Sequence, residues 1–157
     1  MPGLKVGLFK KADLEDATST PVAVQVINIP GVATSEAITF DNVDLIDEEG
    51  NKIEYVAREI YTDDRILDEN EAEPFILGNR KYKVSYSDRE MVITNTELID
   101  ITVKKSWAKN VPATEIKPVE VQLTPGLGKA SETVELNELN DWQQAFENLP
   151  YLETGYS

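Results

Sequence analysis

Three polar residues in predicted strands have the right types to react with one another. Lys10 ends a run from Leu4 in which every second residue is apolar, so one strand face places hydrophobes and an amine in the same core. Glu59 ends the strand-like segment Tyr55–Glu59, and Asn95 closes another apolar strand. Lysine, acid and asparagine on three neighbouring strands can join the lysine amine to the asparagine side chain through an amide bond, with loss of ammonia.

This reaction needs a neutral amine, and an ordinary lysine with a pKa near 10.4 is charged. Burial disfavours charge on both partners, which lowers the pKa of Lys10 and raises that of Glu59. Glu59 can then hydrogen-bond the carbonyl of Asn95 and relay protons to the departing ammonia. The sequence therefore suggests a reaction that occurs once per molecule, without enzymatic turnover.

Each of these residues also has an ordinary structural role. A lysine at the end of a core strand often only reaches water, an asparagine often caps a turn, and a strand glutamate is often solvated. The choice of the lysine that faces the core is open as well, because Lys11 follows Lys10 directly. The face of Val6 and Leu8 favours Lys10, whereas Lys11 shares its face with Phe9.

The elements that must position these residues are short alternating runs bounded by Pro, Gly, Asn and Asp, which predict an all-β antiparallel sandwich or barrel. The predicted strands are Lys5–Lys10, Val22–Ile27, Ala37–Phe40, Lys52–Ile60, Lys81–Tyr86, Met91–Thr96, Ile101–Trp107, Pro118–Leu123, Ser131–Leu136 and Trp142–Phe146.

Composition narrows the possible functions. The chain has 157 residues, 41% of them hydrophobic, and no long apolar run that could insert into a membrane. It contains no cysteine and no histidine, which removes thiolate metal sites and the commonest general base. The formal charge of −14 argues against nucleic acid or anionic lipid as a partner. No apolar signal segment opens the sequence, so any export signal has been removed or was never present.

An internal repeat sets the predicted domain boundary. Phe40–Val43 returns as Phe146–Leu149, and the strand that ends in Lys10 returns with Lys105 in the equivalent place. The expected domains are therefore residues 1–97 and 98–157. The second copy lacks the strands that would carry its acid and asparagine, so we expect a fragment whose incomplete copy is open to strand exchange with a neighbouring chain.

These features resemble the B-type repeat domains of the collagen-binding adhesin, found in surface proteins and pilins of Gram-positive bacteria. The most specific parts are the closing Ile93–Thr96, the run Asp47–Tyr55 leading into Glu59, and the tract Val134–Trp142 with Phe146 and Leu149-Pro150 after it. The opening Lys105-Ser106-Trp107 of the second copy also has the style of this family.

The resemblance implies tandem immunoglobulin-like sandwiches, the second incomplete, with an isopeptide bond between Lys10 and Asn95 assisted by Glu59. In the second copy, Lys105 is the only residue that matches one of these three family positions. Two features depart from the family pattern: no tryptophan follows Lys10 closely, and the tract around Glu153 looks like a shortened version of a segment that holds the acid in a family variant.

The function implied is that of a structural spacer in an adhesin or pilin attached to the cell wall outside the cell, next to further repeats. The alternatives are an adhesive module that binds a host extracellular protein through loops or a sheet edge, and an enzyme, for which no pocket is indicated. No cofactor is expected. The acidic stretch Asp63–Glu73 is predicted to be a solvated loop, and no metal is expected there because it lacks the ligand spacing and glycine of a calcium loop.

Overall fold

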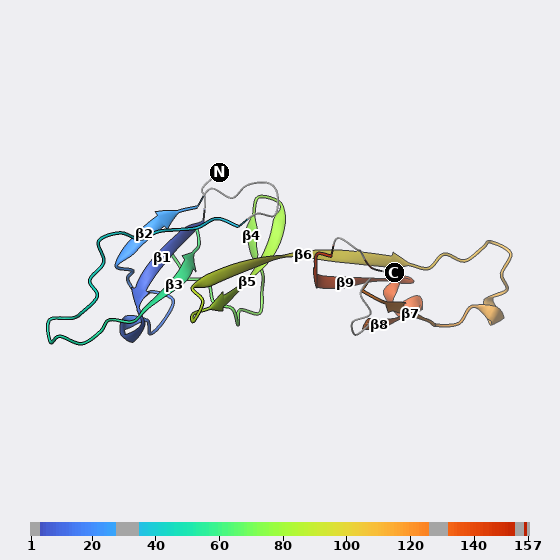
Figure 1. Cartoon of the computed structure of the whole chain (residues 1–157). Helices are drawn as coiled ribbons and strands as arrows, with labels where there is room; N and C mark the ends of the chain where they lie inside the picture. The colour runs from blue at the N-terminus through green and yellow to red at the C-terminus, as the bar shows by residue number, and fades with distance from the viewer. Residues whose placement is uncertain (1–3, 28–34, 126–131, 153–155, 157) are drawn as a thin grey trace. The chain divides into compact units, whose positions relative to one another are not determined.

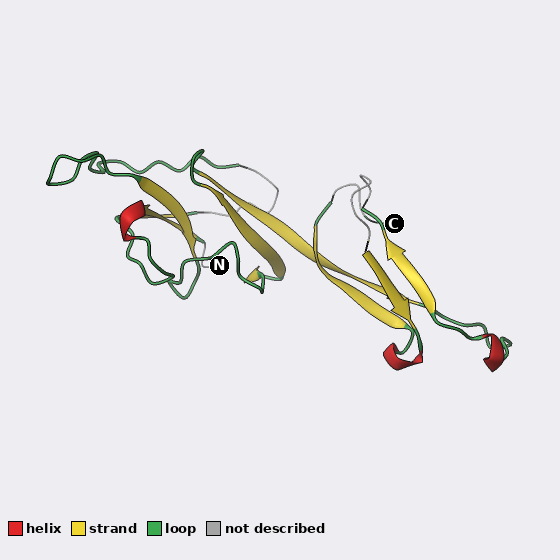
Figure 2. Cartoon of the chain, turned by 90° about the horizontal axis from the view of Figure 1, so that it is seen from below, coloured by secondary structure: helices red, strands yellow, loops and turns green. Residues whose placement is uncertain are grey.

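The structure is a computed structural model that describes residues 4–27, 35–125, 132–152 and 156 (Figure 1). Strands dominate these residues, and the helical elements are three short 3-10 turns at Lys11–Asp13, Ala113–Glu115 and Glu138–Asn140 (Figure 2). The predicted all-β, immunoglobulin-like antiparallel class is confirmed. The strands are β1 (Lys5–Lys10), β2 (Ala23–Val26), β3 (Tyr55–Ile60), β4 (Phe75–Leu77), β5 (Arg80–Ser87), β6 (Val92–Lys104), β7 (Val119–Leu123), β8 (Glu132–Leu136) and β9 (Gln143–Pro150).

The strands form three sheets, ordered β2-β1-β3, β4-β5-β6-β9 and β7-β8. The chain divides into two compact units: unit 1 holds residues 1–73 and 83–95, and unit 2 holds residues 74–82 and 96–157. Strands β5 and β6 each contribute residues to both units. The predicted division into residues 1–97 and 98–157, as two copies of one fold, stays a prediction.

Unit 1 buries both faces of its central strand β1. Val6 and Leu8, on the face predicted to be core, are 2% and 4% exposed. Phe9 points to the other face and packs in a second cluster with Val56, Ile60 and further apolar residues. A strand that is buried on both faces has a continuous hydrophobic sequence. The sequence of Val6–Phe9 fits this pattern better than it fits strict alternation of apolar and polar residues.

Gly7 is required because Phe9 and Ile60 fold over it. A Cβ at position 7 would lie 2.7 Å from Phe9 Cε2 and 2.8 Å from Ile60 Cδ1. We expect Gly7→Ala to lower the free energy of unfolding by about 1–3 kcal/mol, since both side chains are held in a packed cluster. Urea unfolding measures the loss. The added change Phe9→Leu should restore part of the stability, and a Gly7→Ala variant as stable as the parent would contradict this packing.

Unit 2 has its own core. Strand β6 pairs with β9, Ile101 opposite Phe146 and Lys104 opposite Gln143, and β7 pairs with β8. The register shifts between Ile99 and Ile101 of β6, where Glu147 and Asn148 of β9 lie opposite the single residue Asp100, so the bulge is on β9. The buried residues are Leu123, Phe146 and Leu149, with Ile99, Ile101, Val103, Val134 and Tyr156 packed against them.

Four sequence expectations differ from the structure. No strand forms at Ala37–Phe40, and β4 was not predicted. The two strands expected around residues 91–107 are one continuous strand, β6, because Glu97–Asp100 holds no Gly or Pro and the bulge absorbs the irregularity. The acidic stretch Asp63–Glu73 is only partly solvated, since Ile66 and Leu67 within it are buried.

Candidate functional site

Glu59 is the one charged residue that is buried in the part of the chain that the structure describes. It is 2% exposed and lies on β3, directly opposite Val6 of β1. Its side chain points to the core face of the β2-β1-β3 sheet because residues paired across antiparallel strands share a face. Burial of a carboxyl among aliphatic side chains is costly unless the group is hydrogen-bonded or protonated.

Asn95 supplies one hydrogen bond to this acid. Its side-chain Nδ2 donates to Glu59 Oε1 at 2.7 Å, while Asn95 itself is an exposed residue of β6. The second oxygen, Glu59 Oε2, is buried and has no hydrogen-bond partner among the described residues. The sequence expected the reacting strands to be neighbours. In the structure β1 and β3 are hydrogen-bonded neighbours, whereas β6 belongs to another sheet.

The electrostatics of Glu59 follow from this geometry. Burial raises the pKa of Glu59 from 4.5 to about 7, and the hydrogen bond from Asn95 opposes the rise. At neutral pH both the protonated and the ionised carboxyl are therefore populated. A group in this state can both accept and deliver a proton at the amide of Asn95.

Tyr86, which the sequence analysis did not single out, supports Glu59 from β5. Its hydroxyl accepts the backbone N–H of Glu59 at 3.2 Å and donates to the carbonyl of Leu67 at 2.6 Å. Burial raises the pKa of Tyr86, so the hydroxyl keeps its proton. Nothing in the spacing of the six tyrosines distinguishes Tyr86, because its role depends on a contact between distant strands.

Arg58 flanks the same region on the other face of β3. Its guanidinium lies 4.5 Å from the ring centre of Tyr86 and binds both carboxylate oxygens of Asp88, at 2.5 and 3.0 Å. The ion pair raises the pKa of Arg58 and lowers that of Asp88. This bidentate pair fixes β3 against the turn that follows β5.

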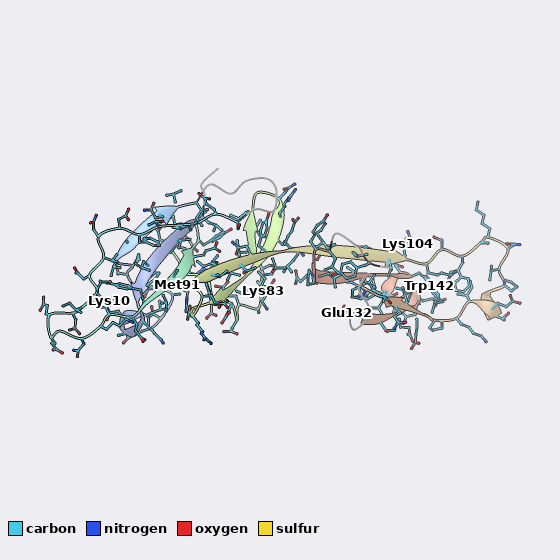
Figure 3. All side chains as sticks on the ribbon, in the orientation of Figure 1. Lys10, Lys83, Met91, Lys104, Glu132 and Trp142 are labelled. Carbon is cyan, nitrogen blue, oxygen red and sulfur yellow. The ribbon has the colours of Figure 1, made fainter. Side chains whose placement is uncertain are left out.

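Lys10 is the last residue of β1 (Figure 3), and the pairing of β1 with β3 places it at the opposite end of this sheet face from Glu59. It is half-buried and pairs with Tyr55, four residues along β3 from Glu59. At the usual rise per residue, this separates the Cα atoms by roughly 13 Å along the strand. None of the hydrogen bonds or ion pairs among the described residues joins the Lys10 ammonium to Glu59 or Asn95. The structure thus brings the acid and the asparagine together and leaves the lysine apart.

Lys11, the alternative lysine, is exposed and begins the 3-10 helix after β1. Its ammonium lies 3.5 Å from a carboxylate oxygen of Glu54, and its backbone N–H donates to the carbonyl of Glu54. Lys11 is therefore part of the surface, outside the face that carries Glu59.

A cavity of about 240 Å³ opens in unit 1 on the Arg58 side of β3. Three of its polar side chains already have partners within the chain: Arg58 binds Asp88, Asp16 accepts from Thr18, and Asp68 accepts from Asn70. In the described residues no group of three or more acidic side chains is placed to hold a metal ion. Across the same residues, no helix is long and apolar enough to cross a bilayer.

Comparison with models of known protein families finds a match for the C-terminal part of the chain. Residues 101–157 match the model of the Cna protein B-type domain. This segment is similar to that family. No curated protein and no solved structure matches the chain. The resemblance of residues 47–59 and 93–96 to the same family lies outside the matched segment and stays a prediction.

The Cna protein B-type segment contains Lys105, the lysine expected to carry over in the second copy. Its backbone N–H donates to the carbonyl of Trp142 at 2.8 Å, and its ammonium lies 4.7 Å from the ring centre of Trp107. The two tryptophans pack edge to face with ring centres 5.4 Å apart. Glu153, the candidate acid of this segment, lies outside the described residues.

Proposed function

We propose that this chain is a structural spacer from a cell-wall-attached adhesin or pilin of a Gram-positive bacterium. The match of residues 101–157 to the Cna protein B-type domain supports this role, because the domains of that family are structural modules of surface proteins. Two all-β units, each with its own compact set of contacts, suit a series of repeats placed outside the cell next to further repeats.

We further propose that unit 1 is locked by an isopeptide bond between Lys10 and Asn95. The single observation that carries this proposal is the 2.7 Å hydrogen bond between Asn95 Nδ2 and Glu59 Oε1, with Oε2 buried and unpartnered. Neutral Lys10 Nζ attacks Asn95 Cγ, the Nζ–Cγ bond forms, and the Cγ–Nδ2 bond breaks. Glu59 takes one proton from the attacking amine and delivers one to Nδ2, which leaves as ammonia.

The structure adds one requirement to this scheme. The Lys10 side chain is too short to span the four residues of β3 between its partner Tyr55 and Glu59, so the bond requires β1 to shift along β3 toward Glu59. A shift by an even number of residues keeps Lys10 on the face of Glu59 and needs no flip of β1. Lys11 points away from this face and would reach it only after a shift by an odd number of residues, which turns the whole core face of β1 outward.

Intact mass spectrometry of the denatured protein tests the bond. We expect the parent chain to be lighter than its sequence mass by one ammonia, and the variants Lys10→Ala, Glu59→Ala and Asn95→Ala to have their full sequence masses. Lys11→Ala is the matched control and should keep the ammonia loss. If the parent chain has its full sequence mass, the bond is absent and the proposal is wrong. If Lys11→Ala is the only lysine variant that has its full sequence mass, the reacting lysine is Lys11.

A second candidate function is adhesion to a host extracellular protein through exposed loops. The observation in its favour is the hairpin closed by the bridge between Ile46 and Lys52, where Leu45 and Ile46 are 75% and 60% exposed. Exposed apolar side chains next to an acidic turn suit a partner with an apolar groove and a basic rim. Binding to host matrix proteins that is equal in the parent and in Leu45→Ser would contradict this function.

A further inference from the structure

Strand β2 is an open edge of unit 1. In the sheet order β2-β1-β3 it pairs only with β1, and Figure 1 shows it as the outermost strand on that side. Among the described residues no strand pairs with its outer side. Edge strands usually carry charges, prolines or bulges that prevent pairing with another chain.

The backbone groups that face outward are those of Val24 and Val26. Ile27 donates its N–H to the carbonyl of Leu4 on β1 at 2.8 Å, and Gln25 pairs with Val6 in the same register. Residues of an antiparallel strand alternate in the direction of their N–H and C=O groups. Ile27 and Gln25 therefore face β1, and the N–H and C=O groups of Val24 and Val26 point to the open side.

The side chains of this edge are apolar and exposed. Val24 and Val26 are 45% and 65% exposed, and Val22 just before the strand is 47% exposed. From Ala17 to Ser35 the sequence contains no charged residue, although the whole chain has a formal charge of −14. The edge thus lacks the charges that protect most edge strands, while the rest of the chain is strongly acidic.

We propose that β2 pairs with β2 of a second copy of this chain. An antiparallel pair centred on Gln25 places Val24 of each copy opposite Val26 of the other, so the outward N–H and C=O groups of both strands bond reciprocally. The contact is self-complementary. It also brings no like charges together, because no charged residue lies between Ala17 and Ser35.

This contact is small and fits a weak association of neighbouring surface molecules, since stable interfaces need far more buried area. The net charge of −14 on each copy opposes association at a distance. Added salt screens that repulsion without weakening the uncharged strand pair. Association should therefore strengthen as ionic strength rises, the reverse of what a contact based on ion pairs would show.

Sedimentation equilibrium over a range of protein and salt concentrations tests the proposal. We expect the average mass of the parent chain to rise toward that of a dimer with concentration. Val24→Pro removes the outward N–H and spares the pairing with β1, so it should weaken association at least tenfold, roughly the loss of two symmetry-related hydrogen bonds. Val24→Thr is the matched control because it keeps the shape and the N–H, and it should associate like the parent.

Circular dichroism shows whether Val24→Pro stays folded, and Val26→Lys, a change of the most exposed valine, gives a second way to weaken the pair. A parent chain that stays monomeric at every concentration and salt level overturns the proposal. So does a dimer that is unaffected by both variants, which would point to strand exchange through unit 2. The proposal is also overturned if an added apolar peptide protects the β2 amides from exchange with solvent while the chain remains monomeric. In that case the open edge binds a strand of another protein.

Discussion

Replacing Asn95 by alanine is expected to lower the free energy of unfolding of unit 1 by roughly 4–5 kcal/mol, if a side-chain amide constrains the unfolded chain as a disulfide does. For a domain of this size the loss corresponds to a decrease of about 20 °C in the midpoint of thermal unfolding. The substitution also removes the hydrogen bond from Asn95 to Glu59 Oε1, so that neither oxygen of this buried carboxyl has a partner. Calorimetry on the parent and on Asn95→Ala measures the difference.

Thr94→Ala is the matched control, because Thr94 is an exposed neighbour on the same strand with its side chain on the other face. Its unfolding should change by no more than about 0.5 kcal/mol. Lys10→Ala should reproduce most of the Asn95→Ala loss, since it prevents the same bond. A Lys10→Ala variant that unfolds at the parent temperature, while Asn95→Ala does not, would show that only the Glu59–Asn95 hydrogen bond matters.

The ionisation of Glu59 is expected to make unit 1 less stable as the pH rises from about 4.5 to about 7. The folded chain holds the proton of Glu59 up to a pKa of about 7, and the unfolded chain releases it near 4.5. Stability from this group is therefore complete below pH 4.5 and is lost as the pH rises through 7. The shift corresponds to roughly 3 kcal/mol. Urea unfolding at several pH values measures it.

The measurement is best made on Lys10→Ala, in which the proposed bond cannot form, with Lys10→Ala/Glu59→Gln as its control. Glutamine keeps the shape and cannot ionise, so the control should lack this slope. The carboxyls of Asp16, Asp47, Asp88 and Asp100, whose pKa values are lowered, titrate below the window and are shared by both variants. If the free energies of unfolding of the two variants change in parallel from pH 4.5 to 8, then folding does not stabilise the protonated carboxyl of Glu59, and the prediction is wrong.

A bond between the first strand and the end of unit 1 would also have a mechanical consequence. Lys10 lies near the start of unit 1 and Asn95 at its last residue, so a pulling force on the chain would pass through the new amide rather than through the sheets. Hydrogen-bonded strands separate one bond at a time under load, while a covalent link does not. This behaviour suits the spacer role proposed above.

Much of the strand content could be predicted from the sequence, because alternation and turn residues are local properties. The position of β1 was predicted to the residue, and β5, β7 and β8 to within a residue or two. Ala37–Phe40 looked like a strand and is not one, because a short apolar run forms a strand only when a partner pairs with it. The continuity of β6 was also missed, since the bulge in β9 opposite Asp100 arises only when the two strands pair.

For the site, the sequence singled out Glu59 and Asn95, which lie in contact in the structure, and it placed Lys10 on the face of Val6 and Leu8, which proves to be the face of Glu59. Only the tertiary structure decided where along that face the groups meet. Side chains alternate with a period of two, so sliding β1 by two or four residues keeps every face unchanged. The pattern therefore cannot tell Val6 from Lys10 as the residue opposite Glu59. That choice is made by the long-range register between β1 and β3, which no local pattern records.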